Sequence, residues 1–394
     1  MKILMIISQF NPIIGGAERQ AQLLAQQLVM KGLEVQVVTG WWKFGTPREE
    51  VMDGIRIFRN FCCWGMFGIK NDRVIRMLGG ITYVMSLGAY LLLHGRKYDI
   101  IHVHQFLYPA FVSVLFGKIF LKKPVLIKNA CSGFTSDMRQ LRSYPLGSLQ
   151  LRYLIKEMEC LVTVSLEGKN EFQAVGYPES KMVYIPNGVE VPSEGKRNYD
   201  QALRFLAIGR LDRQKGIDVL LKAWNILVEK GNNLKLIILG SGPQEFELKE
   251  VSESLKMTES VEFRGTVHDV EKYLKDADLF VLPSRAEGLS NALLEAMAQG
   301  IPCIATNVGG NTELLEAESN DIPPGQFIIA KNGLLINPDD ELGLTEAMLF
   351  LIRNSNIREE VGKRGRIYIQ ENYSIESIAD RYIALYKRLL SERA

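Results

Sequence analysis

The stretch SRAEGLSNALLEAMAQGIP, Ser284–Pro302, places one carboxylate in a loop and a second inside the helix that follows. Glu287 lies in the loop, and Glu295 lies in the second turn of a helical pattern over Asn291–Gln299 that Ser290 can cap. The unpaired N–H groups at a helix start attract an anion such as a phosphate. The two carboxylates can then accept hydrogen bonds from neutral hydroxyl groups on either side of that anion.

A second loop, GRLDRQKG, carries two cations that could neutralise the same anion. Arg210 and Lys215 flank the loop Gly209–Gly216, which lies between a strand pattern and a helix pattern. Guanidinium and ammonium groups placed this way could converge on a diphosphate. The spacing differs from a P-loop. The alternative is that both side chains only solvate a surface loop.

A third glycine-rich loop, NPIIGGAE, follows the first predicted strand. Gly15 and Gly16 would let the backbone approach a ligand at a helix N-terminus, although an ordinary tight turn would look the same. The loop lacks the GxGxxG spacing of a dinucleotide site.

Two other polar pairs could hold a metal. His102 and His104 lie on one face of a predicted strand, but no third ligand follows nearby, so packing or a place in a site wall is the favoured interpretation. The DAD sequence, residues 276–278, resembles an acidic metal motif, yet it lies between a helix and a strand, where Asp commonly forms turns. We therefore predict no metal site.

The elements that must position these residues alternate between strands and helices in both halves of the chain, which predicts parallel sheets covered on both faces. A chain of 394 residues is too long for one typical core, so two domains are expected. Prolines, glycines and charges place the linker around Val191–Gln201. In the second half, Gly300 suits a left-handed helix stop and Pro302 prevents continuation.

Charge and cysteine content narrow the class of protein. Residues 1–195 carry 22 Lys and Arg against 15 Asp and Glu, whereas the remainder carries 25 against 30. This asymmetry is too mild for nucleic acid and favours an anionic lipid or a phosphate-bearing substrate as partner. Five cysteines without metal spacing suggest reduced thiols in a cytoplasmic protein.

One uncharged run, Met77–Leu93, is 17 residues long and has Arg73 and Arg76 before it and Arg96 and Lys97 after it. Its length is at the short limit for crossing a bilayer. A buried domain helix is the favoured interpretation, and an interfacial helix and a true span are the alternatives.

Seven motifs occur in order along nearly the whole chain: GGAE, IPNGVE, GRLDRQKG, GSGP, VLPSRAEGLSNALLEAMAQGIP, VGGNTEL and NGLLINPDD. Together they resemble the retaining family 4 glycosyltransferases, including that family's E-x7-E motif as Glu287 and Glu295. The resemblance implies the GT-B fold, an α/β architecture with two Rossmann-like domains facing across a cleft. The expected domains are residues 1–192 with the crossing-back helix 374–394, which bind the acceptor, and residues 193–373, which bind the nucleotide sugar.

The resemblance also implies roles for individual residues. Arg210, Lys215 and Glu287 would be catalytic: the two cations would contact the diphosphate, and Glu287 the donor sugar. Glu295 would bind the ribose. The donor-binding set would comprise Gly15, Gly16, Arg264, Gly288, Leu289, Ser290, Asn291 and Glu295. Many family members carry a histidine in the loop that reads NACSGFTSD here, so His104, Ser132 and Asp137 are expected to form that wall instead.

The resemblance thus implies a metal-independent, retaining transfer of a sugar from a UDP-, GDP- or other nucleotide sugar, with no further cofactor. The expected acceptor is a glycan or lipid-linked precursor in polysaccharide or lipopolysaccharide assembly. The expected location is the cytoplasm, with peripheral contact with an anionic membrane. An epimerase or hydrolase of the same fold and a non-catalytic subunit of an assembly complex are the alternatives.

Overall fold

A computed structural model describes residues 1–13, 15–64, 73–131, 136–144, 146–193, 203–229, 234–317 and 321–393, with side chains for all of these except 73–76. The chain forms two compact units. Unit 1 comprises Met1–Gly188 and Ile375–Ala394, and unit 2 comprises Val189–Ser374. The expected linker lies outside the described residues from position 194 onward.

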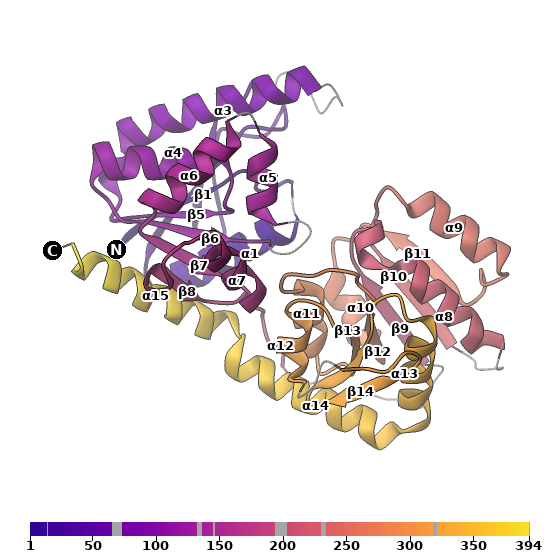
Figure 1. Cartoon of the computed structure of the whole chain (residues 1–394). Coiled ribbons are helices and arrows are strands. Elements are labelled where there is room, and N and C mark those ends of the chain that lie inside the picture. Colours follow the sequence, from indigo (N-terminus) through magenta and orange to yellow (C-terminus); the bar gives the residue numbers. More distant parts are fainter. Residues whose placement is uncertain are drawn as a thin grey trace. The chain divides into compact units, whose positions relative to one another are not determined.

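Unit 1 is built on an eight-stranded sheet with the order β3-β4-β2-β1-β5-β6-β7-β8 (Figure 1). All neighbouring strands are parallel except β3 and β4. The strands are β1 (Lys2–Ile7), β2 (Glu34–Gly40), β3 (Glu49–Met52), β4 (Ile55–Asn60), β5 (Ile100–His104), β6 (Val125–Asn129), β7 (Cys160–Thr163) and β8 (Met182–Tyr184).

Helices cover both faces of this sheet, because successive residues of each central strand alternate between two apolar cores. The helices are α1 (Gly16–Met30), α3 (Arg73–His94), α4 (Tyr108–Phe116), α5 (Asp137–Ser143), α6 (Gly147–Glu157), α7 (Leu166–Ala174) and α15 (Ile375–Ser391). A π-helical turn, η2 (Gly117–Leu121), extends α4. The last helix, α15, returns to unit 1 and packs against α1, as expected from the resemblance to the GT-B glycosyltransferases.

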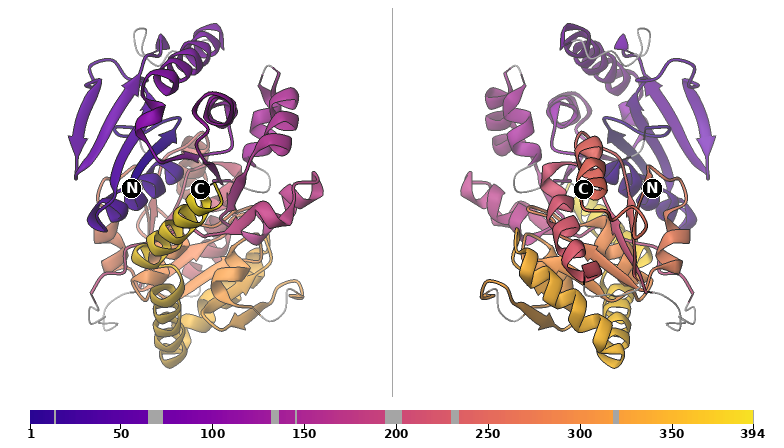
Figure 2. Two further views of the ribbon diagram at one scale, coloured as in Figure 1. Left: turned by 90° about the vertical axis from the view of Figure 1, so that its left-hand side faces the viewer. Right: turned by 90° about the vertical axis from the view of Figure 1, so that its right-hand side faces the viewer.

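Unit 2 has a seven-stranded sheet with the order β11-β10-β9-β12-β13-β15-β14, parallel except for β14 and β15. Its strands are β9 (Leu203–Ile208), β10 (Leu234–Leu239), β11 (Val261–Gly265), β12 (Leu279–Leu282), β13 (Cys303–Thr306), β14 (Phe327–Ala330) and β15 (Gly333–Ile336). Both side views show helices against this sheet (Figure 2).

The helices of unit 2 are α8 (Ile217–Glu229), α9 (Glu245–Ser254), α10 (Val270–Asp276), α11 (Asn291–Ala298), α12 (Asn311–Leu315), α13 (Glu341–Arg353) and α14 (Ser355–Asn372). The predicted start of α11 at Asn291 and the predicted stop at Gly300 are confirmed, and the helix itself ends at Ala298, one residue earlier than predicted. Ser290 accepts a hydrogen bond from the backbone of Leu293, and Gly300 has a left-handed φ of 71°.

Candidate active site

The loops that follow β9 and β12 lie side by side, since these two parallel strands are neighbours and their carboxyl ends share one edge of the sheet. Gly216 permits the close approach. It has a φ of 64°, and a Cβ atom built there would lie 2.1 Å from the carbonyl oxygen of Pro283. No residue with a side chain could occupy this position without moving one loop away from the other.

Lys215 and Glu287 form the centre of the candidate site. The Lys215 Nζ atom lies 2.6 Å from Glu287 Oε1, and the Ser284 hydroxyl donates to the same oxygen over 2.7 Å. The Glu287 side chain is only 7% exposed, so its charge is compensated mainly by these two donors. The structure thus brings together the predicted acid and one of the two predicted cations, which are 72 positions apart in the sequence.

Arg285 ties this centre to the rest of unit 2. Its guanidinium donates two hydrogen bonds to the carboxylate of Asp218, at 2.7 and 2.9 Å, and one to Asp339 at 2.6 Å. It also donates to the carbonyl oxygen of Arg213 over 2.6 Å. The hydrogen bonds to Asp218 raise the pKa of Arg285 above its already high usual value. Arg285 therefore holds the loop of Lys215 against the loop of Glu287.

The Arg285→Lys variant is expected to lower the free energy of unfolding of unit 2 by about 1.5–3 kcal/mol, because an ammonium group cannot reproduce the two-pronged contact with Asp218. The measurement is a chemical or thermal melting curve of the whole chain. The matched control is Arg204→Lys, whose more exposed side chain lies 3.8 Å from Asp276 and should matter by less than about 1 kcal/mol. Equal effects would contradict this role of Arg285.

The start of α11 offers backbone N–H groups next to this centre. Ser290 caps the helix, and Gly288 and Leu289 connect it to the Glu287 loop. The Gly288 carbonyl oxygen accepts from the backbone of Gly310 over 2.7 Å, so the VGGN motif supports the same loop. Glu295 is half-buried in the second turn of α11.

Arg210 lies in the same loop as Lys215 but extends into solvent. Its side chain is 72% exposed, and its nearest acidic group among the described residues is Asp212, with an N–O distance of 3.7 Å. A side chain of this kind can reorient towards an anion without breaking a strong pair.

In unit 1, the predicted GGAE loop begins α1. Gly15 is the N-cap, and its N–H donates to the Glu18 carboxylate over 3.0 Å, which is one of the two hydrogen bonds of a capping box. Burial raises the pKa of Glu18. Gly16 is the first residue of the helix. The turn is therefore fixed by Glu18, a residue for which the GGAE motif alone did not predict a role.

Two of the three predicted wall residues of unit 1, His104 and Asp137, are buried. Asp137 accepts hydrogen bonds from the backbones of Phe106 and Ala130, at 3.0 and 2.9 Å, and burial raises its pKa to about 6. It thus orders the loops after β5 and β6. His104 is stacked on His102 with 4.2 Å between ring centroids, and burial lowers its pKa well below the usual value. Ser132 lies outside the described residues.

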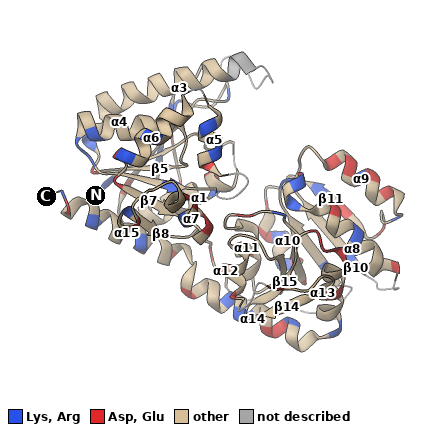
Figure 3. Ribbon diagram, viewed as in Figure 1, with Lys and Arg blue, Asp and Glu red and all other residues tan. Residues whose placement is uncertain are grey.

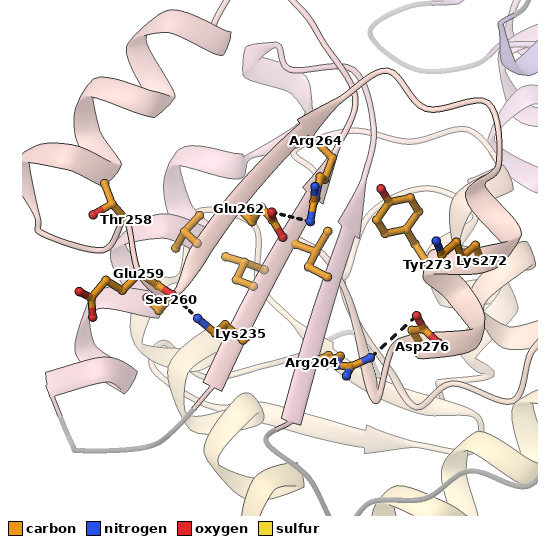
Figure 4. Close-up of a pocket in the computed structure, with 13 residues that line it drawn as sticks. Arg204, Lys235, Thr258, Glu259, Ser260, Glu262, Arg264, Lys272, Tyr273 and Asp276 are labelled. Carbon is orange, nitrogen blue, oxygen red and sulfur yellow. Dashed lines mark hydrogen bonds and ion pairs between the residues drawn. The ribbon is translucent and has the colours of Figure 1, made fainter.

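Arg264 lines a pocket to which none of the other predicted donor-binding residues contributes. This pocket of about 560 Å³ lies over β10 and β11, and in it Arg264 forms a 2.5 Å ion pair with Glu262 (Figure 4). Arg204 and Asp276 lie in the same pocket. The structure does not bring Arg264 together with Lys215 and Glu287.

Both acids of the DAD sequence contact Arg204. Asp278 accepts from the Arg204 N–H over 2.8 Å, and Asp276 faces the Arg204 side chain. Within the described part of the chain, no group of three or more His, Cys, Asp or Glu side chains is arranged to hold a metal ion.

Two family models match the chain. Residues 14–191 match the model described as glycosyltransferase family 4, and residues 202–354 match glycosyl transferases group 1. A structure of Anabaena Alr3699/HepE in complex with UDP-glucose covers the whole of both chains with a TM-score of 0.73 and 17% identity. The chain belongs to the family 4 glycosyltransferases and has the GT-B fold.

Several curated relatives are similar to the chain. An uncharacterized glycosyltransferase, MJ1607 of Methanocaldococcus jannaschii, is 27% identical over 98% of both chains. The N-acetyl-alpha-D-glucosaminyl L-malate synthase of Bacillus anthracis is 24% identical over 97% of this chain and 96% of that protein. The capsular polysaccharide biosynthesis glycosyltransferase CapM of Staphylococcus aureus is 26% identical over 59% of each.

Proposed function

We propose that this glycosyltransferase moves a sugar from a nucleoside-diphosphate sugar to an acceptor hydroxyl, with retention of the anomeric configuration and without a metal ion. The observation that carries the proposal is the Lys215–Glu287 pair beside the start of α11. The cation and the helix N-terminus suit the diphosphate of such a donor, and the carboxylate suits the hydroxyls of its sugar.

The cations act on the leaving group in this proposal. Lys215 uses one of its three N–H donors on Glu287, so two remain for a diphosphate oxygen. Arg210 turns in from solvent, and the N–H groups of α11 bind the second phosphate. These contacts strengthen as charge develops on the departing diphosphate, which lowers the barrier.

The carboxylates act on the two sugars. Glu295 accepts from the ribose hydroxyls, and Glu287 contacts the donor sugar. In the transfer, the bond from the anomeric carbon to the diphosphate breaks and the acceptor oxygen bonds to that carbon on the same face. The acceptor proton passes to an oxygen of the leaving phosphate, so no protein side chain is needed as a base.

The acceptor we propose is a glycan precursor linked to a lipid at the cytoplasmic membrane surface, in polysaccharide or lipopolysaccharide assembly. The name of the similar CapM protein, which places it in capsular polysaccharide biosynthesis, supports this choice. The similar HepE structure was determined with UDP-glucose, so a UDP-sugar is the first donor to test.

The proposal is tested by melting the purified chain against a panel of nucleotide sugars and then following turnover by NMR. The true donor should raise the melting temperature, because a ligand at 100 times its Kd adds about 2.7 kcal/mol. The product's anomeric signal should match that of the donor. An inverted product, or an epimerised sugar formed without acceptor, would overturn the assignment.

Turnover in excess EDTA is expected to equal turnover in magnesium or manganese. Lys215 and Arg210 supply the positive charge that a divalent ion would otherwise place on the diphosphate. The measurement is the initial rate in each buffer after prolonged chelation. Activity lost to EDTA and regained with a divalent ion would show that the metal, and not the two side chains, neutralises the leaving group.

A further inference from the structure

Helix α3 has an apolar face that none of the described residues of its unit covers. Its exposed residues follow helical spacing along one side and are all apolar: Met77, Leu78, Ile81, Met85, Ala89, Leu92 and Leu93. The two most exposed, Met85 and Leu93, are 69% and 75% accessible. This continuous apolar stripe is about 25 Å long. Monomeric soluble proteins rarely expose a contiguous apolar patch of this extent to water.

The opposite side of α3 is part of the core, which fixes how the helix lies. Tyr83, Leu87 and Leu91 are fully buried, and the Tyr83 hydroxyl lies 3.3 Å from the carbonyl oxygen of Ile7 in β1. Among the described residues, one helical segment, Met77–Lys97, is long and apolar enough to cross a membrane, judged by length and composition alone. A helix packed in this way could cross only by leaving the sheet it covers. It can, however, lie flat against an apolar surface.

The apolar face continues onto the neighbouring turn. The π-turn η2 contacts α3 and presents Ile119 and Phe120, both more than half exposed. Directly before η2, Phe116 at the end of α4 packs its ring against Gly88 of α3, where a Cβ atom would lie 3.1 Å from the ring. The exposed apolar residues of α3 and η2 together are called the α3–η2 surface below.

The segment of the chain that carries this surface is rich in basic residues. From Arg73 to Glu157 the chain carries twelve Lys and Arg but only three Asp and Glu. Figure 3 shows α3 without charge along its described length and blue residues near α4, α5 and α6. Arg96 and Lys122 are exposed cations next to the α3–η2 surface, and Lys118, also exposed, forms an ion pair with Glu157. A second copy of the chain would bring like charges together at this face, whereas an anionic bilayer offers both an apolar layer and opposite charge.

We propose that the α3–η2 surface docks onto an anionic lipid bilayer, with its aliphatic and aromatic side chains inserted among the acyl chains and the surrounding cations at the phosphate headgroups. The helix lies in the plane of the membrane and does not cross it. This inference rests on the proposed function, because docking would hold unit 1 at the membrane surface where a lipid-linked acceptor resides. Membrane attachment should therefore have both an apolar and an electrostatic component.

The test is sedimentation of the full chain with vesicles that contain phosphatidylglycerol, in the absence of donor. The Met85→Glu/Leu93→Glu variant is expected to bind about tenfold more weakly or worse, because losing one inserted Leu-sized side chain already changes a binding constant by about that factor. The matched control is Phe246→Glu on α9, where the side chain is 74% exposed but lies in unit 2. Unchanged binding of the double variant would overturn the proposal.

A second variant and two further measurements separate the other outcomes. Arg96→Gln/Lys122→Gln should reduce the preference for phosphatidylglycerol over phosphatidylcholine vesicles. Resistance to alkaline carbonate would indicate a spanning helix, and a dimer of the native chain that Met85→Glu/Leu93→Glu dissociates would indicate a second copy as occupant; either overturns the proposal. Donor turnover with a water-soluble acceptor is measured separately, so a failure of the transfer activity is distinguishable from a failure of membrane docking.

Discussion

Replacing Lys215 by Met is expected to lower kcat by about a hundredfold to a thousandfold, which is typical for the loss of one electrostatic donor to a leaving group. Met keeps the aliphatic chain that lies over Gly209 and removes only the charge. The affinity for free nucleoside diphosphate should fall much less, because the contact gains most of its strength in the transition state. Steady-state kinetics and calorimetric titration of the nucleotide measure the two effects.

The control for this variant is Lys222→Met. Lys222 forms an ion pair with Glu341 at the same 2.6 Å, but on the exposed surface of α8. Kinetics of this variant should match those of the native chain. A double variant, Lys215→Met with Glu287→Gln, removes both charges of the central pair. If Lys215→Met melts at a lower temperature than the native chain, the double variant should recover that melting temperature but not the lost turnover. Recovered turnover would mean that Lys215 serves only to balance a buried charge.

The regular elements near the site could be predicted from the sequence because their information is local. The strand and helix patterns and the Ser290 cap and Gly300 stop of α11 each depend on residues a few positions apart. The β3–β4 hairpin was missed, although Asp53-Gly54 is a common two-residue turn and both residues have positive φ. β3 reads EEVM and half of it faces solvent, so it lacks the apolar run used to recognise strands.

The support of the site could not be predicted in this way, because it joins residues that are distant in the sequence. Arg285 meets Asp218 and Asp339, which are 67 and 54 positions away, and only the order of the strands brings them together. The NPDD motif therefore acquires a role only in the folded chain. Likewise, the uncharged run of α3 was visible in the sequence, but which of its residues face outward depends on the packing against the sheet.

The two acids of the E-x7-E motif are expected to respond differently to substitution. Glu287→Gln should lower kcat by about a hundredfold, since the sugar that Glu287 contacts becomes cationic in the transition state and an amide cannot stabilise that charge. The amide can still bond to Ser284, so the loop should keep its geometry. Glu295→Ala should mainly raise the KM for the donor and lower the affinity for free nucleotide, because the ribose hydroxyls do not change during the reaction.

Ser284→Ala provides the comparison that separates charge from position at Glu287. It removes one of the two donors to the carboxylate and leaves the charge in place, so its kcat should fall between those of the native chain and Glu287→Gln. The three variants are compared by steady-state kinetics and by titration with nucleoside diphosphate. If Glu287→Gln keeps nearly native turnover while Glu295→Ala loses it with nucleotide binding intact, the two acids have the opposite roles, and the sugar lies at α11 with the ribose in the loop.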